Sequence, residues 1–269
     1  MRFITALSAR LTCPKPNARP IRHNGQVPDR NGKIFYTSIT SLSNISKKGW
    51  REAELLADRM SKETIDYFYV SPLGRARDTA SCTLKKTGRT AEVCPWLREF
   101  EAPIWRPDVK DHRKIPWDWM PADWTGDDRA YRRDQWFEME PLAEGNVKQE
   151  YDRVTGEFDR LLERHGYRRQ GGYYQAVCPN RDTLALFCHF GVECVLLSHL
   201  MGASPMVLWH GLCALPTGVT TVVTEERQQG IASFRIIGFG DLSHLYAAGE
   251  TPSFAARFCE CYDSPEERH

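Results

Sequence analysis

Three side chains able to bind an anion or transfer a proton follow short apolar runs in this sequence. His189 comes directly after Leu184–Cys188, a run without polar alternation that predicts a buried parallel strand. A second apolar stretch, with helical spacing, begins at Gly191, and Gly202 marks its predicted end. His189 is therefore expected at the carboxyl end of a strand and just before a helix, where ligands bind in open α/β sheets.

Arg75 and Glu99 are expected at the same edge of the sheet. Ile65–Val70 predicts another strand, and Ser71–Pro72 is expected to begin the helix that follows it. Arg75 then lies in the first turn, where the helix dipole disfavours a cation unless an anion is bound beside it. Glu99 follows a third short strand and brings a carboxylate to this edge.

Each of these side chains alone has a structural interpretation. His189 alone is most simply a buried core histidine, and Arg75 alone a solvent-facing residue paired with Asp78. One His, one Arg and one Glu at three strand ends instead favour a phosphate site with an acid beside it. His199 and His210 stand in apolar context and are expected to be packing or surface residues.

Composition is that of an ordinary folded protein. The chain has 269 residues, 41% hydrophobic and 26% charged, and a net charge of +1, which gives no indication of a nucleic-acid or membrane partner. No apolar run approaches the roughly 18–20 residues of a membrane span. The nine cysteines are scattered, without a CxxC pair or zinc-ligand spacing, and are interpreted as reduced thiols. A cytoplasmic protein without a metal site is expected.

The chain divides by composition into three parts. Residues 1–44 lack helical periodicity, and residues 1–32 are expected to be poorly ordered or loosely packed. Residues 45–269 alternate strands and helices, which predicts a single domain built as a three-layer α/β/α sandwich with a mostly parallel central sheet. Within it, residues 96–141 hold six of the eight tryptophans and predict an ordered insertion that covers the sheet edge.

Four segments occur in an order that is typical of one family. They are ISKKGWREA at 45–53, SPLGRARDTA at 71–80, WLREF at 96–100 and ALFCHFGV at 185–192. They resemble the helix start, the S-x-L-x-R-A-x-x-T signature, the acid-bearing segment and the second-histidine strand of the histidine phosphatase superfamily, in its phosphoglycerate-mutase-like branch. The resemblance extends from about Ile45 to about Leu245 and implies a phosphoglycerate-mutase-like fold.

The resemblance implies a metal-independent phosphatase without a cofactor that acts on a small phosphomonoester. In this family a His in an Arg-His-Gly motif attacks phosphorus, and water then hydrolyses the phosphohistidine. By position, Arg75 would bind the phosphoryl oxygens, His189 would be the second His, and Glu99 would protonate the leaving oxygen. Glu101 is the alternative acid, but Glu99 matches the family spacing. Mutase activity is disfavoured, because nothing in the sequence shows how the intermediate would be kept from water.

The nucleophile motif departs from the family pattern. Arg22-His23-Asn24-Gly25 lies at the expected distance before Ile45, with Asn where Gly is usual. On this interpretation His23 is the nucleophile and Arg22 a phosphate ligand. Arg164-His165-Gly166 is a literal Arg-His-Gly, but it ends a predicted helix and is rejected because Gly166 there is a C-terminal stop.

A third interpretation gives the chain no nucleophile. Lys33–Tyr36 resembles the family's first strand, yet Thr37-Ser38-Ile39 follows where Arg-His-Gly is expected. This strand is predicted to lie beside the strand that ends at Cys188, so that its tip is Thr37. The alternative function is then a phosphate-binding or scaffold protein of the same fold. The sequence does not indicate which phosphomonoester binds, nor the oligomeric state.

Overall fold

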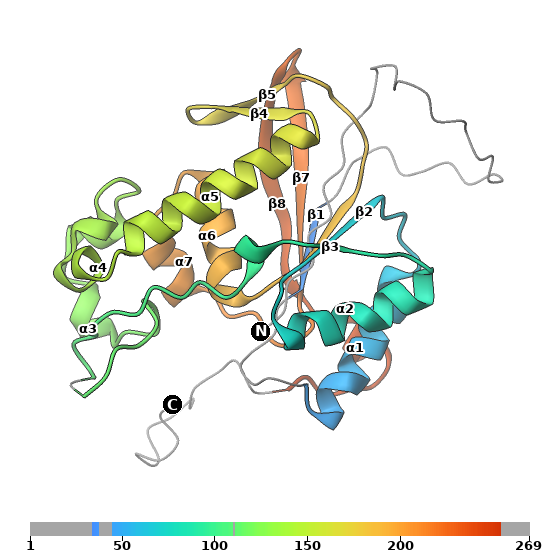
Figure 1. Cartoon of the computed structure of the whole chain (residues 1–269), viewed down its shortest axis with the longest axis horizontal. Coiled ribbons are helices and arrows are strands. Elements are labelled where there is room, and N and C mark those ends of the chain that lie inside the picture. Colours follow the sequence, from blue (N-terminus) through green and yellow to red (C-terminus); the bar gives the residue numbers. More distant parts are fainter. Residues whose placement is uncertain (1–33, 38–44, 110, 254–269) are drawn as a thin grey trace.

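The structure is a computed structural model that describes residues 34–37, 45–109 and 111–253 (Figure 1). Residues 1–32, with the candidate residues Arg22 and His23, lie outside the described residues. The side chains of β1 are likewise not described.

One eight-stranded sheet runs through the described part of the chain. Its strands are β1 (Ile34–Thr37), β2 (Tyr67–Val70), β3 (Glu92–Val93), β4 (Tyr167–Gln170), β5 (Tyr173–Ala176), β6 (Leu184–Phe187), β7 (Val219–Gln228) and β8 (Ile231–Asp241). They lie in the order β3-β2-β6-β1-β7-β8-β5-β4. The first four in this order are parallel to one another, and β7, β8, β5 and β4 each run antiparallel to the strand before.

The parallel strands β1, β2 and β6 end at the same level of the sheet, so the segments that follow them begin at one edge. Phe187 at the end of β6 is paired with Val70 at the end of β2 and with Thr37 at the end of β1. All four residues of β6 are buried, as expected of an apolar run covered on both faces. The predicted first strand beside β6 is confirmed, shifted by one residue, and its tip is Thr37.

Helices cover both faces of the sheet. They are α1 (Lys47–Met60), α2 (Gly74–Thr87), α3 (Pro121–Trp124), α4 (Glu140–Glu144), α5 (Val147–Arg164), α6 (Phe190–Met201), α7 (Pro205–Gly211) and α8 (Ser243–Ala247), with 3-10 turns η1 (Pro95–Leu97), η2 (Asp128–Tyr131) and η3 (Trp136–Glu138). Figure 1 shows α1 and α2 on one side of the sheet and α5, α6 and α7 on the other. The predicted three-layer α/β/α sandwich is confirmed, and its parallel half carries the candidate residues.

Each face has its own apolar core. Alternate residues of β2 and β6 point to opposite faces, so Val70 and Phe187 pack with α1 and α2, whereas Tyr69 and Leu186 pack with α5 and α6. The start of α1 is capped by Ser46, whose hydroxyl accepts a hydrogen bond from the Gly49 backbone N–H at 3.1 Å.

Within the described residues, no helix combines the length and hydrophobicity needed to cross a bilayer.

The tryptophan-rich segment 96–141 contains only short helices, yet it is packed. Five of its six tryptophans are buried, and Trp105 is 45% exposed. The buried guanidinium of Arg106 connects two parts of this segment, because it donates to the Trp117 carbonyl at 2.8 Å and to the Asp118 carbonyl at 2.6 Å. The Asp108 carboxylate pairs with the same guanidinium at 2.5 Å, which compensates for the burial of the Arg106 charge.

Candidate functional site

His189 lies two residues after the end of β6 and is the N-cap of α6, and the residue is completely buried. Arg75 Nε donates to His189 Nδ1 at 3.1 Å. His189 Nε2 lies 2.8 Å from Ser71 Oγ. Because Nδ1 accepts from a guanidinium, the neutral ring carries its proton on Nε2 and donates it to the Ser71 hydroxyl. The histidine is thus fixed in one tautomer between two side chains from the β2–α2 connection.

Ser71 connects the strand end to the helix in a way that the sequence did not predict. The sequence predicts Ser71 as the helix cap, but α2 begins at Gly74 with Leu73 as its N-cap. The Ser71 hydroxyl accepts from the Leu73 backbone N–H at 3.2 Å and also contacts His189. The predicted helix start was therefore wrong by about two residues, because Ser71 turns the chain toward His189 first.

Arg75 lies in the first turn of α2, as predicted, and is partly buried. Burial lowers the pKa of its guanidinium, whereas the charges of Glu99 and Glu101 oppose that shift. An arginine keeps its charge under such conditions. The structure therefore brings a cation to the ring of His189 and into the electrostatic reach of Glu99.

Glu99 comes from the segment after η1 and reaches the N-terminus of α6. Its Oε1 accepts from the Phe100 N–H at 2.9 Å and from the Val192 N–H at 3.2 Å. Burial raises the pKa of the Glu99 carboxyl, and the charge of Arg75 and the two backbone donors oppose this. The result is a carboxyl group that is held by hydrogen bonds and retains a proton more readily than an exposed one.

The alternative acid has a different environment. Glu101 is exposed and pairs with the exposed Arg98 at 3.0 Å. Glu99, in contrast, contacts the first turn of α6 directly after His189. The geometry therefore favours Glu99 over Glu101 as the acid of the site.

Gly191 lets two side chains approach the start of α6. A Cβ atom at this position would lie 2.4 Å from Trp117 Cη2 and 2.8 Å from Glu99 Oε1. Both separations are shorter than a van der Waals contact, so no larger residue fits without displacing one of the two. The sequence signal was the glycine two residues after His189, but nothing in the sequence indicated which side chains it accommodates.

Glu193, in the first turn of α6, was missed by the sequence analysis. It is completely buried, and neither of its carboxyl oxygens is in hydrogen-bond geometry with a partner. Burial raises the pKa of Glu193 well above its ordinary range, with the Thr220 hydroxyl opposing and the charge of Glu99 adding to the shift. The group is therefore expected to keep its proton to a higher pH than an exposed glutamate does.

Replacing Glu193 by glutamine is expected to remove a pH-dependent loss of stability. With its folded-state pKa raised, wild-type stability is complete below the ordinary Glu pKa of about 4.3 and falls by about 1.4 kcal/mol per pH unit above it, up to the folded-state pKa. Thermal melts from pH 4 to 8 would show the advantage of Glu193→Gln growing with pH. Parallel curves for wild type and Glu193→Gln would contradict a raised pKa at Glu193.

The literal Arg-His-Gly segment lies at the end of α5, as predicted. His165 is the C-cap of this helix, and Gly166 has φ +88°. Tyr69 Oη and His165 Nε2 are hydrogen-bonded at 2.7 Å, and burial lowers the pKa of His165 to about 4. This histidine is thus a packed, neutral side chain and not part of the edge that holds His189.

The other histidines considered have structural surroundings. His199 Nε2 lies 2.9 Å from Asp159 Oδ2. His210 accepts from the Trp119 N–H at 3.1 Å and donates to the Met206 carbonyl at 2.8 Å. Both therefore have packing roles, as expected from their apolar context.

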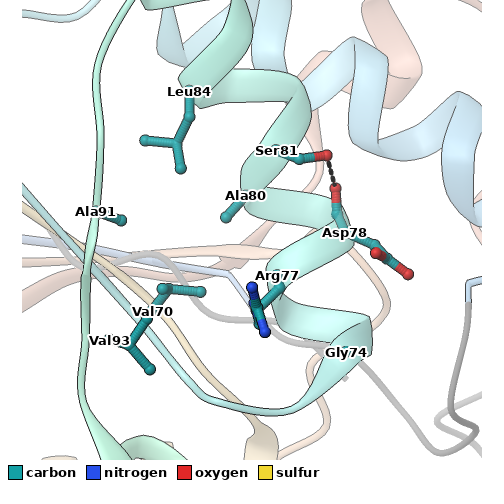
Figure 2. Close-up of a pocket in the computed structure, with 9 residues that line it drawn as sticks. All are labelled: Val70, Gly74, Arg77, Asp78, Ala80, Ser81, Leu84, Ala91 and Val93. Atoms are coloured by element: carbon teal, nitrogen blue, oxygen red, sulfur yellow. Dashed lines mark hydrogen bonds between the residues drawn. The ribbon is translucent and has the colours of Figure 1, made fainter.

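A groove of about 450 Å³ lies beside the site (Figure 2). Its lining residues are Val70, Gly74, Arg77, Asp78, Ala80, Ser81, Leu84, Ala91 and Val93. Figure 2 shows Arg77 on the side of α2 that faces Val93, with the Asp78 carboxylate turned away. Helix α2 thus directs Arg75 to His189 and Arg77 to this separate groove.

The strand predicted beside β6 ends at the same edge of the sheet as the strand before His189. Thr37 ends β1 beside Phe187, two residues before His189. His23 and Arg22 lie outside the described residues, so their roles stay predictions. In the described part of the chain, no three His, Cys, Asp or Glu side chains are grouped to hold a metal ion.

Comparison with known proteins identifies the family. A sequence model described as histidine phosphatase superfamily (branch 1) matches residues 21–236. The chain therefore belongs to the histidine phosphatase superfamily. Membership of this family supports a phosphatase-type function. A comparison with curated protein sequences gives no match.

Several solved structures are similar to the chain at low sequence identity. Phosphoserine phosphatase from Entamoeba histolytica, in complex with 3-phosphoglyceric acid, is 15% identical, with a TM-score of 0.47 over 75% of this chain and 86% of that chain. A mycobacterial glucosyl-3-phosphoglycerate phosphatase is 14% identical, with a TM-score of 0.45 over 89% and 98%. The alpha-ribazole phosphatase from Shigella flexneri is 16% identical, with a TM-score of 0.45 over 76% and 88%.

Proposed function

We propose that the protein is a phosphoric monoester hydrolase that cleaves a small phosphomonoester through a phosphohistidine intermediate. The observation that carries the proposal is the contact of His189 with both Ser71 and Arg75, with Glu99 at the start of the same helix. These groups come from three different strand ends. Together they offer fixed positive charge and a proton donor to one phosphoryl group.

Arg75 and His189 would bind the phosphoryl oxygens. In phosphoryl transfer, charge spreads over the equatorial oxygens, and fixed donors stabilise it without reorganisation. Arg75 supplies a permanent charge, and His189 supplies a ring whose orientation is set by Ser71. When the phosphate arrives, its oxygens would compete for the same donors, and a metal ion is not required for this binding.

Glu99 would act as the general acid. The phosphorus–oxygen bond breaks as the Glu99 proton moves to the leaving oxygen, and the carboxylate then takes a proton from the attacking water. A raised pKa favours the protonated form needed for the first step. Arg75 beside it would stabilise the carboxylate formed between the steps.

His23 is the proposed nucleophile, with Arg22 as a further phosphate ligand. Attack by a ring nitrogen of His23 on phosphorus would release the alcohol and form the phosphohistidine, which water hydrolyses to phosphate and free histidine. The competing candidate is a phosphate-binding or scaffold protein of the same fold. It is favoured by one observation: β1 ends at Thr37, followed in the sequence by Ser38-Ile39 where the family has Arg-His-Gly.

A cytoplasmic location and a small phosphorylated substrate complete the proposal. The buried cysteines Cys94, Cys188 and Cys194 are free thiols, which suits a reducing compartment. The segment 96–141, which packs on the start of α6 through Trp117, is the proposed source of substrate specificity.

His189→Ala is expected to lower the hydrolysis of p-nitrophenyl phosphate by about 10²–10³-fold in the presence of EDTA, because one oxyanion donor is lost. His23→Ala is expected to abolish it if His23 is the nucleophile. The exposed His112→Ala is the control and should retain wild-type rates. Absence of turnover in the wild type, with vanadate or phosphate still bound, would support the scaffold protein instead.

A further inference from the structure

The acid of the proposed site is enclosed by a side chain from the tryptophan-rich segment. Trp117 and Glu99 meet at the same face of Gly191, where an added Cβ would lie 2.4 Å and 2.7 Å from the indole atoms Cη2 and Cζ3. The same Cβ would lie 2.8 Å from Glu99 Oε1. The indole edge and the carboxyl group therefore approach the same side of Gly191.

The indole is held rigidly in this place. Trp117 is 4% exposed, and its ring packs against that of Trp209 with centroids 5.9 Å apart. Trp209 is fixed in turn, because its Nε1 donates to the Gly191 carbonyl at 3.0 Å. On the backbone side, Arg106 donates to the Trp117 carbonyl at 2.8 Å. The Trp117 ring is therefore held from both sides and forms a fixed boundary of the space around Glu99.

We propose that Trp117 is a positioning residue that holds the Glu99 carboxyl against the N-terminus of α6 and keeps water away from it. The inference rests on the proposed function only for its catalytic meaning; the contact itself does not depend on activity. Trp117 lies next to Glu99 at Gly191 and is not proposed to bind the phosphoryl group. Its effect on the reaction therefore passes through the orientation and the proton of Glu99.

The position of the Trp117 indole also affects the pKa of the Glu99 carboxyl. A carboxyl group against an indole loses hydration, which disfavours the carboxylate and raises the pKa of the acid. Two backbone donors, Phe100 and Val192, and the charge of Arg75 act in the opposite direction. The neighbouring carboxyl group on α6, Glu193, is also buried and brings no positive charge that would stabilise the Glu99 carboxylate. Removing the indole should therefore shift the balance toward the carboxylate.

The direct test is a titration of the Glu99 carboxyl by carbon-detected NMR, with Glu99→Gln used to assign the signal. In wild type the midpoint is expected above the ordinary value of about 4.3. Trp117→Ala should lower it by about one pH unit or more, and Trp117→Phe, whose ring is shorter, by less. Trp124→Ala is the matched control: it removes a buried tryptophan of the same segment that packs on His210.

Equal midpoints in wild type, Trp117→Ala and Trp124→Ala would overturn the proposal. Should Trp117→Ala fail to fold, Trp117→Phe decides the question by the same comparison. The titration is independent of turnover, so an inactive wild type would count against the proposed function and leave the role of Trp117 decided by the midpoints.

Kinetics adds a second readout. Trp117→Ala is expected to reduce kcat for an alkyl phosphate at least about tenfold more than kcat for p-nitrophenyl phosphate, whose leaving group needs little protonation. A merely structural role would reduce both rates equally. Equal losses together with an unchanged midpoint would exclude Trp117 as a positioning residue.

Discussion

Arg75→Ala is expected to lower kcat/KM for a phosphomonoester by about 10²–10³-fold, because a charge-assisted donor at a developing charge contributes about 3–4 kcal/mol. The guanidinium also holds His189 Nδ1 at 3.1 Å, so the ring loses one of its orienting partners. Folding should be nearly unchanged, since the side chain is only partly buried. Steady-state kinetics and a vanadate titration measure the loss, and a thermal melt checks the fold.

Arg77→Ala is the matched control. It removes the same side chain two residues further along α2, on the side that lines the groove of Figure 2. Its kcat/KM should stay within about threefold of wild type, as expected for a charge that does not meet the transition state. Arg75→Lys should recover little, because lysine lacks the planar fork that reaches both His189 and a phosphoryl oxygen. A lost thermal transition in Arg75→Ala, without a specific kinetic effect, would identify a structural residue.

The elements that hold the site were predictable because their signals are local. The apolar run Leu184–Cys188 predicted β6, and the helically spaced stretch from Gly191 predicted α6, which begins one residue earlier. The signature around Arg75 placed this residue in the first turn of α2. Local signals of this kind predict which strand ends meet, since parallel strands of one sheet end at one edge.

Contacts between distant segments were not predictable. Segment 96–141 was expected to cover the sheet edge, but the position of Trp117 beside Gly191 and Glu99 depends on how a segment with little regular structure folds back. Glu193 has no sequence signal for its burial, because α6 is covered on nearly all sides and thus lacks a polar face. Such residues become visible only when the tertiary packing is known.

The predicted start of α2 was wrong for a related reason. A serine before a proline is a common cap, and the local rule placed the start at Pro72. In the structure the Ser71 hydroxyl is shared with His189, and the helix begins only at Gly74. The Ser71 hydroxyl thus has a partner 118 residues away in the sequence in addition to the local Leu73 N–H.

Glu99→Gln is expected to lower kcat for an alkyl phosphate by about 10²–10⁴-fold, since general acid catalysis contributes this much when the leaving group is poor. The amide keeps the shape of the side chain and its acceptor oxygen for Val192, so the fold should persist. With p-nitrophenyl phosphate the loss should be much smaller. Glu101→Gln is the matched control, because this exposed carboxylate pairs only with Arg98 among the described residues.

The pH profile separates an acid from a merely structural carboxylate. The acid must be protonated, and burial raises the pKa of Glu99, so wild-type activity toward an alkyl phosphate should fall as pH rises through that pKa. Glu99→Gln has no such proton to lose, and its residual rate should show no decline in that range. If the decline persists unchanged in Glu99→Gln but disappears in Glu101→Gln, the proton comes from Glu101, and the roles of the two carboxylates must be exchanged.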